Sequence, residues 1–318
     1  MLFGNAMLFG NAMLLATRVH GPTMSASVSP RIKGLTFEAC DVKSLPEVSA
    51  FFVDAFWLGS TTFGSIDLSA SDKRQLEQKV REDLGPRYGI QSKDQRPTMM
   101  GGKKGFPSKS LFDTRLIVAR EAGGEIVGCA GLEAALYESE QGNVFRSDQA
   151  DRLVRTELDA MSKDEAQMAS EAYAEGGIGA LSKGVIEGAF TDELVNQYIT
   201  IWTPCGVLAN LAVAPSYRRS GLGRALCDEC EKCITDEWKM DEIALQVEEA
   251  NTAAITLYRK DGYRDVFRAE EMKALRLQPS EASVFASLPG PFSALAPENK
   301  ELLKEVESAT LTMSKPLR

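Results

Sequence analysis

Histidine is almost absent from this chain of 318 residues. The single histidine, His20, lies close to the N-terminus, in a segment where we expect little structure. A mechanism that needs a histidine base, a histidine zinc ligand or a Ser-His-Asp relay therefore lacks its key residue. This absence excludes many classes of hydrolase.

Long hydrophobic runs and an excess of positive charge are also missing. The most apolar stretch, residues 1–16, is interrupted by Asn5, Asn11 and two glycines, so it does not meet the requirements of a membrane span. The formal net charge is -9 and the isoelectric point is near 5.0. Nucleic acids and anionic lipids both need a basic surface. We therefore expect a soluble protein with neutral or basic partners, no membrane span and no nucleic-acid partner.

Acidic residues are missing from the first 37 positions. The first of them is Glu38, whereas Arg18, Arg31 and Lys33 precede it among serine, threonine and proline. This acid-poor composition is typical of an organelle-targeting segment. A disordered tail, or a start site placed upstream of Met24, would have the same composition. We set residues 1–30 apart and expect the stroma or matrix of a plastid or other organelle, or otherwise the cytoplasm.

The chain has six cysteines but is too long to need disulfides for stability, which indicates a reducing compartment. Cys227, Cys230 and Cys233 have the spacing C-x-x-C-x-x-C, which on a flexible loop could bind a metal. The segment predicts a helix, which would spread the three thiols over an arc of about 120° and about 9 Å of axis. We therefore expect small, partly buried helix residues and no metal.

From residue 34 the apolar pattern is regular. Strands are expected at 35–39, 114–119, 126–136, 206–213, 242–247, 262–267 and 310–315, and helices at 45–56, 71–84, 221–237 and 251–260. Gly85 and Pro86 are expected to end the second helix. Strands and helices do not alternate strictly, so the fold class is α+β (mixed α/β), with a central mixed sheet flanked by helices in one domain over residues 31–318.

Two stretches break this pattern and are interpreted as insertions, at about 137–197 and 268–308. The first has thirteen acidic against five basic residues, which is eight of the nine excess negative charges. Part of it, about 148–174, is expected to be a solvated helical flap with Leu153, Leu158, Met161 and Met168 on its apolar side. The second is rich in proline, serine and alanine, and ends in an amphipathic turn around residues 302–306.

The segment 215–224 links an apolar strand to a helix. The glycines at 221 and 223 allow backbone N–H groups to converge, and the helix that starts there adds the positive end of its dipole. Arg218, Arg219 and Arg224 add guanidinium groups, which suit phosphate. The loop is thus suited to a pyrophosphate, although a Gly-x-Gly turn is often only a tight connection. It matches neither a Gly-x-Gly-x-x-Gly turn nor a Walker loop.

Two motifs together resemble the GNAT N-acetyltransferase superfamily. Leu211-Ala212-Val213-x-Pro215-x-Tyr217-Arg218-Arg219-x-Gly221-Leu222-Gly223 resembles its acetyl-coenzyme A (acetyl-CoA) signature, and Asn251-x-x-Ala254-Ile255-x-Leu257-Tyr258-x-x-x-Gly262-Tyr263 resembles its fourth helix and sixth strand. The motifs are closest to those of ribosomal-protein alanine N-acetyltransferases and plastid GNAT-like acetyltransferases. The resemblance implies the GNAT fold, acetyl-CoA as cosubstrate without a metal, and direct attack by an amine in a ternary complex.

By this resemblance, thirteen residues would contact the cofactor: Leu211, Ala212, Val213, Arg218, Arg219, Ser220, Gly221, Leu222, Gly223, Arg224, Asn251, Ala254 and Tyr258. The backbone of Leu211 and Val213 would bind the pantetheine arm, and the N–H near Leu211 would meet the developing oxyanion. Tyr258 would protonate the leaving thiolate, because the ordinary pKa of tyrosine is near 10. The alternative for Tyr258 is a packed residue of an amphipathic helix.

The general base is harder to identify. In the ribosomal-protein alanine N-acetyltransferases a glutamate on the fifth strand suits that role, but Gln246 stands at the matching position. An amide cannot accept the proton. Glu248 is our first candidate, acting through a water; Glu249, Glu38 and acidic residues of the first insertion are the others. Solvated acids at a strand end remain the alternative reading of Glu248 and Glu249.

The acceptor implied by the resemblance is a protein lysine, a protein N-terminus or a small amine, bound between residues 51–84 and 268–308. An acidic chain suits a basic protein segment or a polyamine. A catalytically weak or inactive binding or scaffold protein with the same fold is the alternative, motivated by Gln246 and the insertions. An enzyme that acts on nucleotide phosphates would lack its Walker lysine. The oligomeric state is left open.

Overall fold

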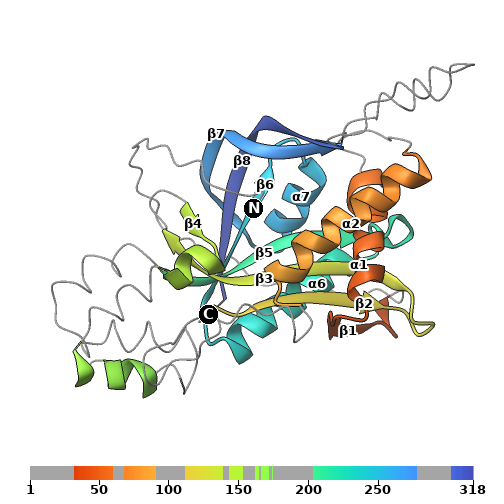
Figure 1. Ribbon diagram of the computed structural model, residues 1–318. Helices are drawn as coiled ribbons and strands as arrows, with labels where there is room; N and C mark the ends of the chain where they lie inside the picture. Colours follow the sequence, from red (N-terminus) through yellow and green to blue (C-terminus); the bar gives the residue numbers. More distant parts are fainter. Residues whose placement is uncertain are drawn as a thin grey trace, which may run out of the picture.

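The computed structural model describes residues 32–59, 68–90, 112–138, 143–152, 162–164, 166–171, 174, 203–277 and 302–317 (Figure 1). The expected targeting segment, residues 91–111 and most of the acidic insertion lie outside the described residues. Within the part of the chain that is described, no helix combines the length and apolarity that a membrane crossing requires.

A mixed sheet of eight strands forms the centre of the molecule. The strands are β1 (Thr36–Ala39), β2 (Thr114–Arg120), β3 (Ile126–Glu138), β4 (Asn143–Phe145), β5 (Thr203–Val213), β6 (Glu242–Glu248), β7 (Arg264–Leu277) and β8 (Leu303–Pro316). Their order is β1-β2-β3-β5-β6-β8-β7, and β4 pairs with β3 beside this path. Only β5 and β6 run parallel. The sheet confirms the predicted α+β class.

Four longer helices cover the two faces of the sheet: α1 (Leu45–Phe52), α2 (Ala70–Arg87), α6 (Leu222–Lys232) and α7 (Thr252–Lys260). Helix α1 continues as a π-helical turn at Val53–Leu58, and α6 continues as another at Cys233–Glu237. Helices α1 and α2 pack on one face, whereas α6 and α7 share a hydrophobic core on the other (Figure 1). The two faces of the sheet therefore have separate cores.

Apolar spacing explains these positions. In α2 the predicted stripe of Leu76, Val80 and Leu84 is buried, because residues four apart lie on one side of a helix. Along β3 the side chains alternate between the two cores: Cys129 belongs to the α1–α2 core and Ala130 to the α6–α7 core. Strand β3 is therefore buried on both faces.

The second predicted insertion is wrong in its extent. Strand β7 continues to Leu277 and β8 begins at Leu303, so the two strands occupy both ends of the range 268–308, and residues 303–306 of the expected turn are strand. The segments contain alanine, glutamate, methionine and lysine, which favour a helix. Pairing between the strands from Arg264↔Ser314 to Leu277↔Leu303 overrides that local preference.

One helix boundary also differs from expectation. Helix α2 passes through Gly85 and Pro86 and ends at Arg87, because the carbonyls of these two residues still accept bonds from Ile90 and Gly89, at 2.7 and 3.2 Å. In the acidic insertion, residues 147–152 and 166–171 are helical. The remainder of the expected flap, including Leu153, Leu158 and Met161, lies outside the described residues.

Candidate active site

Strands β5 and β6 pair over a short distance and then separate. Their parallel register runs from Gly206↔Ile243 to Leu208↔Leu245, after which β5 continues to Val213 beside β3 alone. The separation coincides with a bulge, since β5 has two residues, 210 and 211, between the pairs Gly131↔Ala209 and Cys129↔Ala212, where β3 has one. A bulge takes its extra residues out of the hydrogen-bonded ladder. The backbone near Leu211 is thus placed where β5 leaves β6.

The bulged strand leads into the predicted phosphate loop. After β5, a 3-10 turn at Pro215–Tyr217 and a further turn lead to Gly221, which precedes α6 with φ of 98°. This backbone conformation is one that only glycine adopts without strain. Ser220 Oγ donates to the Tyr217 carbonyl at 2.6 Å and accepts from the Leu222 N–H at 3.4 Å, which closes the turn. The first N–H groups of α6 have no partner within the helix and follow this turn directly, which is the backbone arrangement of an anion site.

Gly223 has a packing role that the sequence did not indicate. A Cβ atom at this position would lie 3.1 Å from Leu257 Cδ2 of α7. The glycine therefore allows α6 and α7 to approach closely, which fixes the distance between the two helices expected to border the cofactor.

Arg218 does not lie where the phosphate interpretation placed it. Its guanidinium donates to the carbonyls of Gly59 and Ala55 at 2.7 and 3.0 Å, and to the Val213 carbonyl at 3.4 Å. The last carbonyls of a helix have no partner within it and attract cations. Arg218 thus connects the phosphate loop to the end of the π-helical turn after α1, and this correction leaves Arg219 and Arg224 as the exposed cations near the loop.

Arg224 is held in place by a carboxylate. Its Nε lies 3.0 Å from Asp261 Oδ1, a side chain only 1% exposed, while Arg224 itself is 45% exposed. Arg219 is exposed and has φ of 62°, so the turn directs it away from the core. Both arginines remain available to a ligand at the surface.

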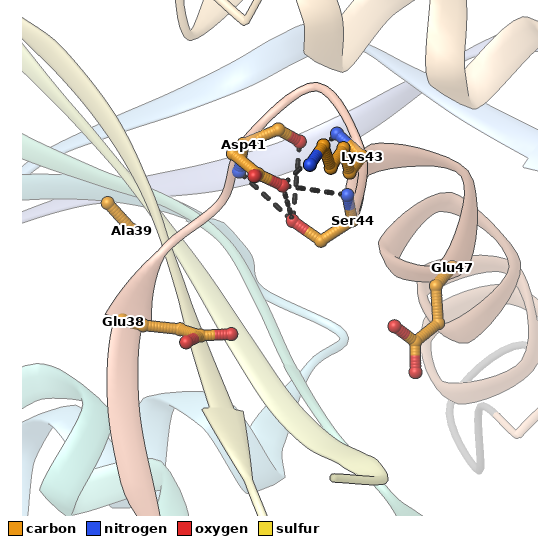
Figure 2. A pocket seen from close by; sticks show the side chains of 6 residues that line it. All are labelled: Glu38, Ala39, Asp41, Lys43, Ser44 and Glu47. Atoms are coloured by element: carbon orange, nitrogen blue, oxygen red, sulfur yellow. Dashed lines mark hydrogen bonds between the residues drawn. The ribbon is translucent and has the colours of Figure 1, made fainter.

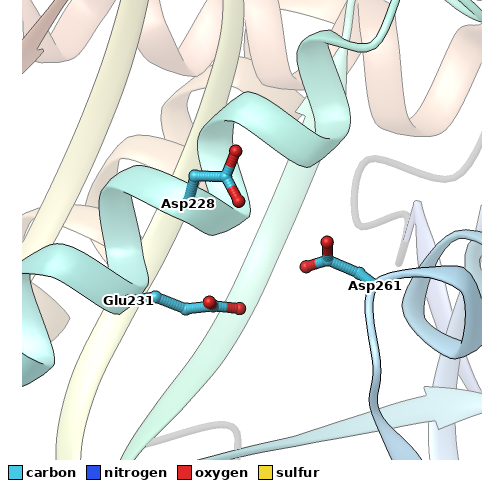
Figure 3. Close-up of side chains that lie close together, drawn as sticks. All are labelled: Asp228, Glu231 and Asp261. Carbon is cyan, nitrogen blue, oxygen red and sulfur yellow. The ribbon is translucent and has the colours of Figure 1, made fainter. Parts of the chain in front are cut away.

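Asp261 belongs to a cluster of three carboxylates with Asp228 and Glu231, whose oxygens approach within 4.8 Å of one another (Figure 3). Burial raises the pKa of both Glu231 and Asp261. The Lys315 ammonium contacts Glu231 at 2.7 and 2.8 Å and Asp261 at 3.5 Å. A protein side chain thus supplies the cation that these carboxylates require, and the cluster ties α6, α7 and β8 together.

Asn251 caps helix α7. Its Oδ1 accepts a hydrogen bond from the Ala254 N–H at 3.2 Å, which satisfies one of the free donors at the helix start. The side-chain NH₂ is not used in this cap and can donate elsewhere. Ala254 is half-buried and packs on the α6–α7 core. Both predicted residues therefore lie at the start of α7.

The side chain of Tyr258, in α7, is buried. It is 7% exposed, and its ring centroid is 5.6 Å from that of Tyr263. Burial raises the pKa of Tyr258, and nearby Cys227 and Cys230 act in the same direction. The phenol therefore stays protonated at neutral pH, as a proton donor must.

Glu248, the first candidate for the base, is occupied by other groups. The Arg276 guanidinium binds both carboxylate oxygens, the Nη1–Oε1 distance being 2.9 Å, and Ser308 Oγ donates to Oε2 at 2.9 Å. Glu249 is paired with Arg268 at 2.7 Å, and this hydrogen-bonded arginine lowers the pKa of Glu249. A base role for either carboxylate requires its ion pair to open.

The other two positions weighed for proton transfer lie far apart. Gln246 is half-buried on β6, on the same side of the strand as Glu248, and is paired with Thr312 of β8. Glu38 lies on the edge strand β1 and contacts Arg120 at 2.7 Å. In the strand order, β2, β3 and β5 separate β1 from β6. Glu38 is therefore removed from the point where β5 and β6 separate, and its candidacy as a base was wrong.

A hollow beside Glu38 does not support a role for this residue as the general base. Glu38, Ala39, Asp41, Lys43, Ser44 and Glu47 line it at the turn from β1 to α1 (Figure 2). Asp41 Oδ1 accepts from the Ser44 hydroxyl at 2.6 Å and its N–H at 2.8 Å, which is the hydrogen bonding of a turn before a helix. This hollow is a feature of that turn.

Three polar residues near the bulge, Tyr88, Asn210 and Glu133, were not among the predicted site residues. Tyr88, at the end of α2, accepts a hydrogen bond from Asn210 Nδ2 at 2.8 Å. Glu133, an acidic residue in the middle of the apolar strand β3, is 2% exposed and contacts Arg87 at 2.6 Å and Arg146 at 2.9 Å. Burial raises the pKa of Glu133, and Arg87 opposes that shift. An isolated charge in an apolar strand was the signal that could have indicated this group.

All six cysteines are within the described residues and none forms a disulfide. Cys227, Cys230 and Cys233 are buried in α6 and the π-helical turn that continues it, as expected for packed helix residues. Burial raises the pKa of all three thiols, and that of Cys233 reaches about 12. They belong to the core between α6 and the sheet.

Comparison with known proteins gives matches to curated relatives over a short segment. The chain is 36% identical over 61 residues to an N-alpha-acetyltransferase of Sulfurisphaera tokodaii and 33% identical over 61 residues to one of Sulfolobus acidocaldarius. Each match covers 19% of this chain and 36% of the relative. The chain thus spans about a third of the length of these curated relatives.

Solved structures of acetyltransferases align over most of the chain at low identity. The ribosomal-protein-S18-alanine N-acetyltransferase from Escherichia coli aligns at 12% identity and a TM-score of 0.37, over 89% of this chain and 94% of its own. An acetyltransferase of the GNAT family from Streptococcus pneumoniae aligns at 13% identity and a TM-score of 0.36, over 89% and 99%.

The family assignment rests on a broader match. The model of the Acetyltransferase (GNAT) family covers residues 91–263, which is more than half of the chain and includes the bulged strand, the glycine turn and α7. The chain therefore belongs to the GNAT acetyltransferase family.

Proposed function

We propose that this protein transfers an acetyl group from acetyl-CoA to an amine by direct attack in a ternary complex. The observation that carries the proposal is the separation of β5 from β6 at a bulge, followed by a glycine turn and the start of α6. This arrangement places free backbone groups and a helix N-terminus at one end of the sheet, where a thioester and its diphosphate can bind together.

The start of α6 is suited to the diphosphate. Gly221 adopts φ of 98° and Ser220 closes the turn, so N–H groups converge without an obstructing Cβ. Arg219 and Arg224 are exposed beside it and add positive charge. Arg218 contributes indirectly, since it fixes the loop to the carbonyls of Ala55 and Gly59.

Acetyl transfer forms a C–N bond and breaks the C–S bond of the thioester. The Leu211 N–H stabilises the negative charge that develops on the acetyl oxygen. The buried phenol of Tyr258 donates a proton to the thiolate as it leaves, which its raised pKa permits at neutral pH. The amine loses its proton to a base or to water.

Glu248 is the proposed base, acting through a water and with its ion pair to Arg276 opened. It lies at the end of β6, two residues beyond Gln246 and on the same side of the strand. Deprotonation by bulk water is the competing route, which would make turnover depend on the fraction of free amine.

A protein N-terminus is the proposed acceptor. The curated relatives are named N-alpha-acetyltransferases, and the acidic balance of this chain favours a basic protein segment. Lysine side chains and small amines are the other acceptors to be tested.

A catalytically weak or inactive binding protein is the second candidate function. Two observations favour it: an amide, Gln246, occupies the strand position expected for the base, and Glu248 is engaged by Arg276 and Ser308. This candidate predicts a bound coenzyme or none, and no acetyl transfer to any amine.

Measuring cofactor binding separately from acetyl transfer tests both functions. Calorimetry gives the affinity for acetyl-CoA, and labelled acetyl-CoA with peptides and small amines gives turnover. Binding with transfer to an α-amine supports the proposal. The absence of transfer to any amine supports the second candidate, whether or not the coenzyme binds, and the absence of binding contradicts the proposed acetyl transfer.

The pH–rate profile then tests the base. Glu248→Gln should lower kcat/KM most where the acceptor amine is largely protonated and least at high pH, because abundant free amine removes the need for a base. An unaltered profile rejects Glu248. Activity that appears only in Gln246→Glu would show that the natural chain has lost catalysis.

A further inference from the structure

The bulge in β5 contains a backbone conformation that is unusual for a strand. Asn210 has φ of 52°, in the left-handed region, and is one of three residues other than glycine with positive φ in the described part of the chain. Asparagine tolerates this region better than most residues. The conformation still needs surrounding contacts that hold it.

A hydrogen bond to Tyr88, the residue that follows helix α2, provides such a contact. Asn210 Nδ2 donates to Tyr88 Oη at 2.8 Å, although 122 residues separate the two in sequence. Tyr88 is the residue that follows α2 and is 4% exposed, so its hydroxyl has little access to solvent. Losing either partner would leave a buried polar group without this bond.

Strand β3 leaves room for this contact. Gly131 faces the Tyr88 ring, and a Cβ atom there would lie 1.9 Å from Tyr88 Oη and 2.3 Å from Cζ. Gly131 pairs with Ala209, at the point where the bulge begins. Any other residue at 131 would displace the phenol from Asn210.

Arg87, the residue before Tyr88, is held in place by contacts of its own. The Arg87 guanidinium lies 5.8 Å from the centre of the Tyr88 ring and donates to the buried Glu133 at 2.6 Å. Arg146 contacts the same carboxylate oxygen at 2.9 Å. The end of α2 is thus anchored to β3 on one side and to the β5 bulge on the other.

We propose that Tyr88, through its hydrogen bond to Asn210, is a positioning residue that holds the β5 bulge in the geometry that directs the Leu211 N–H to the acetyl oxygen. This inference rests on the proposed acetyl transfer. Tyr88 acts on the transition state through β5, because a donor placed slightly out of line loses most of its effect on a developing charge.

The test compares kcat and the acetyl-CoA KM of the full-length wild type, Tyr88→Phe, Asn210→Gly and the double variant. Glycine at 210 keeps the positive φ accessible but removes the amide. We expect each single variant to lower kcat by about tenfold or more, with KM changed by less than about twofold. The double variant should lose no more than either single variant, because both remove the same bond.

Tyr137→Phe is the matched control. Tyr137 is also fully buried and lies on β3, at the end distant from the bulge. It should leave kcat unchanged, which separates positioning of the bulge from the mere removal of a buried tyrosine hydroxyl on the same sheet. If Tyr88→Phe does not fold, Asn210→Gly against this control carries the test.

The outcomes separate the inference from the proposed function. A wild type without acetyl transfer overturns the proposed function and this inference with it. An active wild type whose Tyr88→Phe keeps kcat within about twofold overturns the inference alone. The inference is also overturned if the fold-losses in kcat of the two single variants multiply in the double variant. A loss of kcat in Tyr137→Phe as large as that in Tyr88→Phe overturns it as well.

Discussion

Arg218 joins parts of the molecule that are far apart in sequence. Its guanidinium binds carbonyls at residues 55 and 59, across more than 150 positions of the chain. Three bonds from one planar fork fix the orientation of the turn that precedes Gly221. The phosphate loop and the α1 side of the molecule should therefore move together.

Gly221 allows the phosphate loop to be tested with a matched control. Gly34 has the same φ of 98°, and a Cβ atom there would meet no other atom within 4 Å, so alanine at either site encounters the same backbone strain. We expect both alanine variants to lose about 1 to 2 kcal/mol of stability. Only Gly221→Ala should also raise the acetyl-CoA KM, by about tenfold or more, because the diphosphate must approach its backbone.

Steady-state kinetics and chemical denaturation of the two variants provide the comparison. An unchanged KM in a folded Gly221→Ala variant would contradict the loop assignment.

Tyr258→Phe removes a hydroxyl and leaves the packed ring. If the phenol protonates the leaving thiolate, kcat should fall about 100-fold with acetyl-CoA affinity nearly intact. Because burial raises the pKa of Tyr258, its ionisation should cause no fall in wild-type kcat between pH 7 and about pH 10. A kcat loss under about threefold would assign the proton to water.

Among the elements, β7 and β8 are the strands whose full extent could not be predicted from the local sequence. Their edges carry ion pairs such as Lys273–Glu305 at 2.8 Å, and the pairing partners are far apart in sequence. The strands at 206–213 and 242–247, by contrast, were predicted because apolar β-branched residues and tight turns agree there. Burial on two faces produces an apolar run that can be recognised in sequence, whereas a solvated hairpin has a composition that also suits a helix.

The same limit applies to the candidate site. The glycine turn and a helix starting near Asn251 could be predicted, since both depend on residues within one turn of the chain. The direction of Arg218 and the contact between Tyr88 and Asn210 could not, because their partners come from distant segments. Such contacts are set by packing of the whole domain.

Lys315 tests how β8 is held to helices α6 and α7. Lys315→Met leaves Glu231 and the buried Asp261 without their ammonium partner. We expect a loss of about 2 to 4 kcal/mol at pH 7, reduced from the full cost of a broken buried pair by partial exposure. Because burial raises both pKa values in the folded state, folding favours proton uptake, and stability should recover as pH falls from 7 toward 5.

Lys232→Met is the control for that experiment. Lys232 pairs with Glu229 on the surface of α6, the helix that also carries Glu231. Denaturant unfolding at several pH values should show a change within about 1 kcal/mol and little pH dependence. A Lys315→Met variant as stable as Lys232→Met at pH 7 would show that the carboxylate cluster does not need its lysine.

At the scale of the whole molecule, the distribution of thiols is measurable. Five of the six cysteines are buried, whereas Cys40 is partly exposed at the junction of β1 and α1. We expect a disulfide-exchange reagent to react with one thiol in the native protein and with six in denaturant. Burial also raises the pKa of Cys40, so that reaction should be slow at pH 7 and accelerate as pH rises. More than one reactive thiol in the native protein would contradict the burial of the other five cysteines.

This distribution of sulfur makes the natural chain suitable for labelling at one site. A maleimide dye on Cys40 would lie just before α1, the helix whose π-helical continuation Arg218 ties to the phosphate loop. Fluorescence from that dye could follow ligand-induced movement of the loop without any substitution in the protein.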